Sequence, residues 1–107
     1  MSTITAHADL ATLINVFTVQ LERARELADL LTAATEEVMQ HIDGFISANI
    51  HLSTDGTRVV NYAQWRNAEA MQAMRSNPAA QEHMTRCADL ADGFEPHLYT
   101  VESVHQA

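Results

Sequence analysis

The 107-residue chain contains no lysine, one cysteine, two prolines and three glycines. The single cysteine, Cys87, excludes an internal disulfide and any metal site built from several thiolates. All six basic residues are arginines, and the 14 acidic residues outnumber them, so the formal net charge is −8. This acidic balance argues against nucleic acid or an anionic membrane as a partner, because phosphate groups are bound by basic patches.

Long apolar runs are also missing from the chain. None approaches the roughly 18 residues that a membrane span requires. The N-terminus lacks the basic start and apolar run of a signal peptide. Hydrophobic residues make up 47% of the chain, which is typical of a folded domain. We therefore expect a cytoplasmic protein with one domain over residues 10–107, preceded by a loose polar leader over residues 1–9.

Hydrophobic periodicity divides the domain into strands and helices. Residues 12–19, 45–53, 57–65 and 97–105 are rich in β-branched and aromatic residues, which predicts four strands. Apolar residues recur every three or four positions over residues 21–42, which predicts one amphipathic helix that ends at Gly44. Asn67 and Asn77 are typical caps for two further helices, the second of which is expected to end at Gly93.

The order of these elements indicates the fold. The pattern strand, helix, strand, strand, helix, strand is typical of an α+β, ferredoxin-like split βαβ arrangement with a four-stranded antiparallel sheet. The helices of this fold cover only one face of the sheet, yet the predicted strands carry apolar residues on both faces. A bare apolar face would exceed what a monomer exposes, so we expect two copies to pack sheet to sheet in a homodimer.

A distinctive stretch lies in the middle of the chain: GFISA at residues 44–48, His51, STDGT at 53–57, and VNYAQW at 60–65. It resembles the antibiotic biosynthesis monooxygenase family and, within it, the cofactor-independent anthrone oxygenases of aromatic polyketide pathways. The close match runs from Gly44 to Met71. It implies a dimeric α+β barrel with a cavity between sheet and helices in each subunit, and a small aromatic substrate with O₂ as the partners.

The resemblance also implies site residues. Asn61 and Trp65 would border the cavity as the catalytic pair, Tyr62 would lie next to them, and Arg86 would contact the substrate. Met71 stands where the better-studied anthrone oxygenases carry a tyrosine. Other roles remain open, because Trp65 and Met71 also suit a core and Arg86 also suits a surface ion pair.

The expected strand and helix faces add two histidine candidates, one on a strand and one on a helix. Period-two alternation places Val59, Asn61, Ala63 and Trp65 on one face of their strand, with Tyr62 and Gln64 on the other. Phe45, Ser47, Asn49 and His51 alternate on one face of the preceding strand. If that face joins the Asn61 face, His51 is a candidate base. His83 lies on the apolar face of the last helix, either lining the cavity or satisfied within the core.

Motifs for cofactors are absent from the sequence. It has no Gly-x-Gly-x-x-Gly fingerprint and no close His and carboxylate spacing for a metal. We therefore expect no cofactor and no metal. Together with this absence, the resemblance implies a monooxygenase that oxidises a polycyclic phenolic, anthrone-type substrate to a quinone with O₂. Two alternatives stay open. One is a haem-binding or haem-degrading protein of the same fold, using Asn15 and His83, with Met74 where a Trp is expected. The other is a non-catalytic ligand-binding or cyclase-like polyketide protein.

Overall fold

The computed structural model describes residues 1–107, and its strands and helices follow one another in the expected order. Short 3₁₀ turns precede and follow the first helix, at Leu21–Arg23 and Met39–His41. The elements are β1 (Ala11–Thr18), α1 (Ala24–Glu37), β2 (Phe45–Leu52), β3 (Arg58–Trp65), α2 (Ala68–Arg75), α3 (Pro78–Leu90) and β4 (Gly93–Tyr99).

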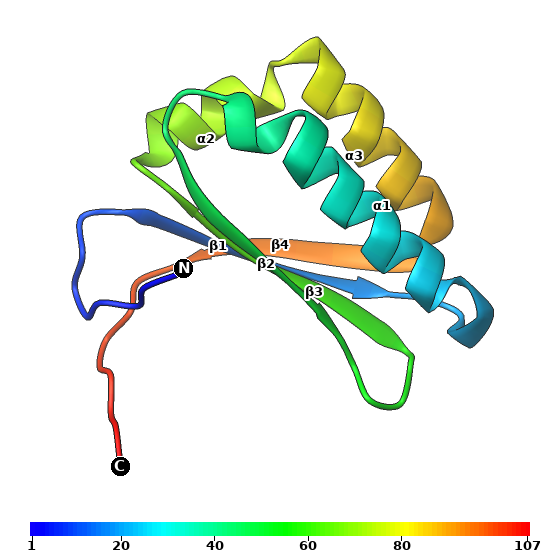
Figure 1. Cartoon of the computed structure of the whole chain (residues 1–107), viewed down its shortest axis with the longest axis horizontal. Coiled ribbons are helices and arrows are strands. Elements are labelled where there is room, and N and C mark those ends of the chain that lie inside the picture. The colour runs from blue at the N-terminus through cyan, green and yellow to red at the C-terminus, as the bar shows by residue number, and fades with distance from the viewer.

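The four strands form one antiparallel sheet in the order β2-β3-β1-β4. All three helices lie on one side of this sheet (Figure 1). This arrangement confirms the α+β, ferredoxin-like fold. We call the sheet face under the helices the inner face and the opposite one the outer face.

The helices bury their apolar stripes against the inner face. One cluster of buried residues gathers around Trp65, Met71 and Met74, and a second gathers around Phe17, Leu27 and Val59. The predicted helix caps are confirmed. Asn67 and Asn77 each accept a hydrogen bond from the backbone N–H three residues on, at 2.8 and 3.1 Å, so α2 and α3 begin at defined positions.

A bulge near the start of β2 changes which residues face the helices. Phe45 pairs with Trp65, but Ser47 already pairs with Gln64, so Ile46 is the extra residue. Beyond the bulge, Ala48 and Ile50 lie on the inner face opposite Ala63 and Asn61. The expected grouping of Phe45 with Ser47, Asn49 and His51 on one face is therefore wrong beyond Phe45, and the condition under which His51 was a candidate base is not met. Ser47, Asn49 and His51 lie on the outer face rather than with Asn61.

Two element boundaries also differ from the prediction. The amphipathic pattern of residues 21–42 is not one helix, because α1 ends at Glu37 and a 3₁₀ turn follows. Val38, Met39 and Ile42 still pack on the core, so the apolar period continues beyond the helix that it predicted. The last strand is Gly93–Tyr99 rather than 97–105. Pro96 is tolerated there because β4 is an edge strand that pairs only with β1.

The N-terminal residues run along the outer face. The Ser2 hydroxyl donates to the Asn49 side chain at 2.6 Å, and the Gln64 amide donates to the Thr3 carbonyl at 2.8 Å. Gln64 is consequently buried although it points away from the helices. The last residues extend away from the sheet (Figure 1). None of the helices has the length and apolar character needed to cross a membrane.

Candidate functional site

A cavity of about 670 Å³ lies between the inner face of the sheet and the helices. It is lined by 22 residues, of which 14 are hydrophobic. Its volume is in the range that accommodates a small organic ligand, and its mixture of many apolar and a few polar groups is typical of such a site. Five of the lining residues are themselves exposed, so the cavity opens to solvent beside them: Arg75, Gln81, Thr85, Phe94 and Pro96.

The floor of the cavity is formed by adjacent strands. Asn61, Ala63 and Trp65 of β3 all line it, as the alternation along the strand predicted. Ala63 pairs with Ala48 of β2 on one side and Leu13 of β1 on the other. The two short alanine side chains leave space where larger residues would fill the layer between sheet and helices.

Two asparagine amides lie side by side on this floor. Asn15 of β1 is the direct antiparallel partner of Asn61 of β3, and both line the cavity. The Oδ1 atoms of both are buried and have no hydrogen-bond partner in the chain. An unpartnered buried amide costs free energy, about 1–3 kcal/mol for each group, and is rare in folded proteins. Such a pair is best explained by a ligand that completes its hydrogen bonds.

Trp65 forms the wall at one end of the cavity. Its side chain is only 2% exposed and packs edge-on against Phe45, with ring centroids 5.4 Å apart. Such T-shaped packing holds both rings in fixed orientations.

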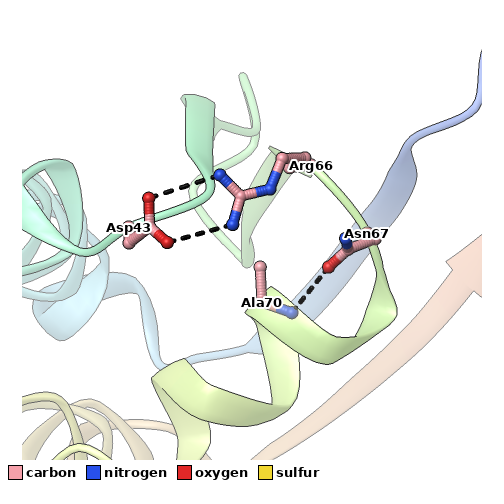
Figure 2. A network of polar contacts seen from close by, with 4 residues as sticks. All are labelled: Asp43, Arg66, Asn67 and Ala70. Carbon is pink, nitrogen blue, oxygen red and sulfur yellow. Dashed lines mark hydrogen bonds and ion pairs between the residues drawn. The ribbon is translucent and has the colours of Figure 1, made fainter.

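The chain just beyond Trp65 is anchored at three points. Arg66 forms a two-point contact with Asp43 at 3.0 and 3.3 Å (Figure 2). Its backbone N–H donates to the Gly44 carbonyl at 2.7 Å. Asn67 then caps α2 through Ala70 (Figure 2). The hydrogen bonds and positive charge of Arg66 hold the pKa of the Asp43 carboxyl below its ordinary value, so the carboxylate stays charged. This corner fixes where β3 ends and thus where the indole lies.

His83 is the histidine that the structure brings to the cavity. It projects from α3, its side chain is 13% exposed, and its Nδ1 atom is buried without a partner. Its Nε2 atom lies 3.7 Å from a carboxylate oxygen of Glu37, at the end of α1. No group of three or more His, Cys, Asp or Glu side chains lies close enough to hold a metal ion.

The remaining sequence candidates lie outside the cavity. His51 and Tyr62 lie on the outer face, the former because of the β2 bulge. The His51 ring contacts the Asn49 carbonyl at 3.1 Å. Met71 is buried in the core cluster behind Trp65. Arg86 is exposed on α3 and does not line the cavity.

Several lining residues were not among the predicted site residues. Asn15 appeared only in the haem alternative, although an Asn within a β-branched strand carries the same signal as Asn61, because Asn is depleted in strands. Arg75, Cys87, Phe94 and Pro96 also line the cavity. Their contribution depends on how the helices and β4 close over the sheet, which the sequence pattern does not specify.

Comparisons with known proteins agree with this architecture. The family model described as antibiotic biosynthesis monooxygenase matches residues 10–86. The tetracenomycin-F1 monooxygenase of Streptomyces glaucescens is 47% identical over 91 residues, which cover 85% of this chain and 81% of that protein.

Two solved structures have a similar fold. A monooxygenase of Streptomyces coelicolor, ActVA-Orf6, whose structure holds the ligand nanaomycin D, is 26% identical with a TM-score of 0.79 and covers 94% of each chain. The cofactor-independent oxygenase SnoaB of Streptomyces nogalater is 22% identical with a TM-score of 0.80, covering 91% of this chain and 97% of that one.

Proposed function

The chain belongs to the antibiotic biosynthesis monooxygenase family, and we propose that it is a monooxygenase of an aromatic polyketide pathway that uses O₂ without a cofactor. We also propose that it acts in the cytoplasm. We propose further that its substrate is a polycyclic phenol of the anthrone type and that the product is the quinone. The relative at 47% identity supports the reaction class, and the apolar cavity with its two amides supports the substrate class.

The proposed reaction places the oxidising power in the substrate and O₂. Direct reaction of triplet O₂ with an organic molecule is slow, and most oxygenases therefore rely on flavin, haem or a metal. An anthrone that loses a proton becomes an electron-rich anion that can donate one electron to O₂. Recombination of the two radicals gives a peroxide, and loss of water leaves the quinone. In total the ring carbon exchanges two hydrogens for one oxygen, and the other oxygen leaves as water.

The protein's part is to favour the anion and exclude bulk water. The apolar walls hold the rings and remove competing solvent. Asn15 and Asn61 lie where a substrate oxygen can replace their missing partners, by accepting from a phenolic O–H or by donating N–H to the oxyanion once it forms. This pair of unpartnered amides on the cavity floor is the observation that carries the proposal.

Oxygen uptake tests the proposed activity. Purified protein is mixed with an anthrone in air, and oxygen consumption and quinone absorbance are followed together. We expect Asn61→Ala to lower kcat/KM by about 100-fold, because removing one oxyanion donor typically costs 10²–10³ in rate. Gln72→Ala, which removes an exposed side-chain amide of α2 that does not line the cavity, is the control and is expected to act as wild type. No uptake above buffer with several polyphenols would refute the activity.

The same assays separate the two alternatives. Asn15 and His83 both line the cavity, as a haem site on this fold would require. A saturable Soret shift on titration with haem would favour that function, and a flat titration would remove it. Binding of a polyphenol with no oxygen consumption would favour the non-catalytic or cyclase-like protein.

We also propose that the protein is a homodimer formed by the outer faces of two sheets. Ile14, Val16 and Val60 lie on this face, half-buried, and Ile46 is 45% exposed. Val60→Arg would place a charge in the centre of such an interface. Light scattering is expected to give twice the chain mass of 11.9 kDa for the wild type and a shift towards one chain for the variant. A wild-type protein of single-chain mass at high concentration would refute the dimer.

A further inference from the structure

His83 combines two features that no structural role explains. Its ring lines the cavity, and its buried Nδ1 has no hydrogen-bond partner in the chain. Its other nitrogen faces the carboxylate of Glu37 at 3.7 Å, across the contact between α3 and α1. A histidine that only filled the core would satisfy its ring nitrogens with backbone or side-chain groups. Here one nitrogen is left for a ligand, and the other lies near a fixed negative charge.

We propose that His83 is the base that ionises the substrate and that Glu37 is the positioning residue behind it. The proposal rests on the proposed function, for which it supplies the missing proton acceptor. The anthrone reacts as its enol tautomer, in which one hydrogen of the reacting ring carbon has moved to the carbonyl oxygen. This O–H bond breaks, its proton forms an N–H bond at Nδ1, and the electron pair stays on the substrate oxygen. The imidazolium then holds one positive charge between the carboxylate and the new oxyanion. The imidazolium later returns this proton to the peroxide, and the remaining hydrogen of the ring carbon leaves with it as water.

Elimination among the cavity residues supports this assignment. The titratable side chains that line the cavity are Arg75 of α2, with His83 and Cys87 of α3, and the strands contribute none. Arg75 stays protonated at any ordinary pH and is no base. Burial raises the pKa of the Cys87 thiol to about 11, with a smaller opposing effect from Arg86, so this thiol keeps its proton near neutral pH. His83 is left as the cavity-lining group whose buried ring nitrogen has no hydrogen-bond partner.

The pairing with Glu37 explains how the ring holds its orientation. Glu37 is 67% exposed, so its charge is partly screened by water, but it is the carboxylate that meets the imidazole in this structure. A carboxylate at one nitrogen favours the tautomer whose other nitrogen is free to accept a proton. A carboxylate also stabilises the imidazolium once it forms. Glu37 therefore prepares His83 without touching the substrate.

A dye-binding experiment tests the proton transfer without turnover. Alizarin is a dihydroxyanthraquinone whose visible band moves to longer wavelength when a phenol ionises. At a pH where free alizarin is protonated, we expect the dye bound to wild type to show the anion band. His83→Gln is expected to bind it with the neutral band. Glu37→Gln should show a reduced anion band, whereas Glu36→Gln, which removes the adjacent exposed carboxylate, should match wild type.

Turnover gives an independent readout. We expect His83→Gln to lower kcat/KM with an anthrone by about 100-fold at neutral pH, because general base catalysis typically contributes 10²–10⁴. The deficit should narrow as pH rises past the ionisation of the free substrate, since water has then already removed the proton. A purely structural role for His83 would give a deficit that does not change with pH. His105→Gln, at the exposed end of the chain, is the histidine control.

The outcomes separate this inference from the proposed function. A wild-type protein that neither binds alizarin nor consumes oxygen refutes both. A wild-type protein that consumes oxygen, together with a His83→Gln variant that keeps its rate and the dye's anion band, refutes the base alone. An anion band that depends on His83 establishes the proton transfer whichever substrate the protein uses.

Discussion

Enlarging a side chain on the cavity floor should stabilise the protein while leaving less room for a ligand. Ala63 is 3% exposed, lines the cavity and is flanked by Ala48 and Leu13 on the neighbouring strands. Ala63→Leu would add three carbons that point into about 670 Å³ of space, rather than into packed atoms. In a well-packed core the same change would force neighbouring side chains and backbone to shift.

The expected magnitude follows from transfer free energies. Each added carbon group is worth about 0.8 kcal/mol when it leaves water, so Leu gains at most about 2.4 kcal/mol over Ala. Fixing its rotamers removes about 0.5–1 kcal/mol of that gain. We therefore expect the free energy of unfolding to rise by roughly 1–2 kcal/mol, whereas overpacking a filled core would lower it by about 1–3 kcal/mol.

Urea unfolding measures this difference, and the chain offers a matched control. Ala80 is fully buried in a core cluster but does not line the cavity, so Ala80→Leu should destabilise the protein. Trp65 is the single tryptophan and lies at the cavity wall, so quenching of its fluorescence reports ligand binding in the same samples. A loss of stability in Ala63→Leu comparable to that in Ala80→Leu would show that the space does not exist.

Three further predictions concern the frame around the site. Gly44 has a backbone φ of +88°, and a Cβ at this position would collide with the Cβ of Ala70. Gly44→Ala should therefore lower the free energy of unfolding, measured in urea, by at least about 1–2 kcal/mol. An unchanged urea midpoint would contradict the corner geometry. Asn67→Ala removes the cap of α2 and should cost about 1 kcal/mol by the same measurement, with Asn67→Ser restoring most of it. The Cys87 thiol, 3% exposed with its pKa raised by burial to about 11, should react with a thiol reagent at pH 8 far more slowly in the native protein than in urea; equal rates would refute its burial.

Much of the fold followed from local patterns in the sequence. The asparagine caps of α2 and α3 and the alternation along β3 each depend on residues close together in the chain, and each was confirmed. Errors arose where the outcome depends on distant partners. A proline such as Pro96 is typical of the end of a strand when the sequence is considered alone. It fits within β4 because this edge strand forms backbone hydrogen bonds with β1 only.

The site was predictable to the extent that one strand determines it. Asn61 and Trp65 both line the cavity because alternation along β3 is regular. His51 was misplaced because the extra residue in β2 reverses the faces, and nothing in the local polarity marks it. The neighbourhood of Asn15 with Asn61, and of His83 with Glu37, comes from tertiary pairing, which no single segment contains.

The inserted Ile46 has a practical consequence for anyone who redesigns this enzyme. Odd-numbered residues face the helices before Ile46 and even-numbered residues face them after it. A mutant library that reshapes the cavity from β2 must therefore vary Phe45 and Ala48. Removing Ile46 would make the alternation regular from Phe45 onward, with Ala48 and Ile50 still under the helices and Ser47 and Asn49 still on the outer face. Homologues that lack this insertion should therefore carry their inward apolar residues two and four positions after the residue equivalent to Phe45, where this chain has them three and five positions after it.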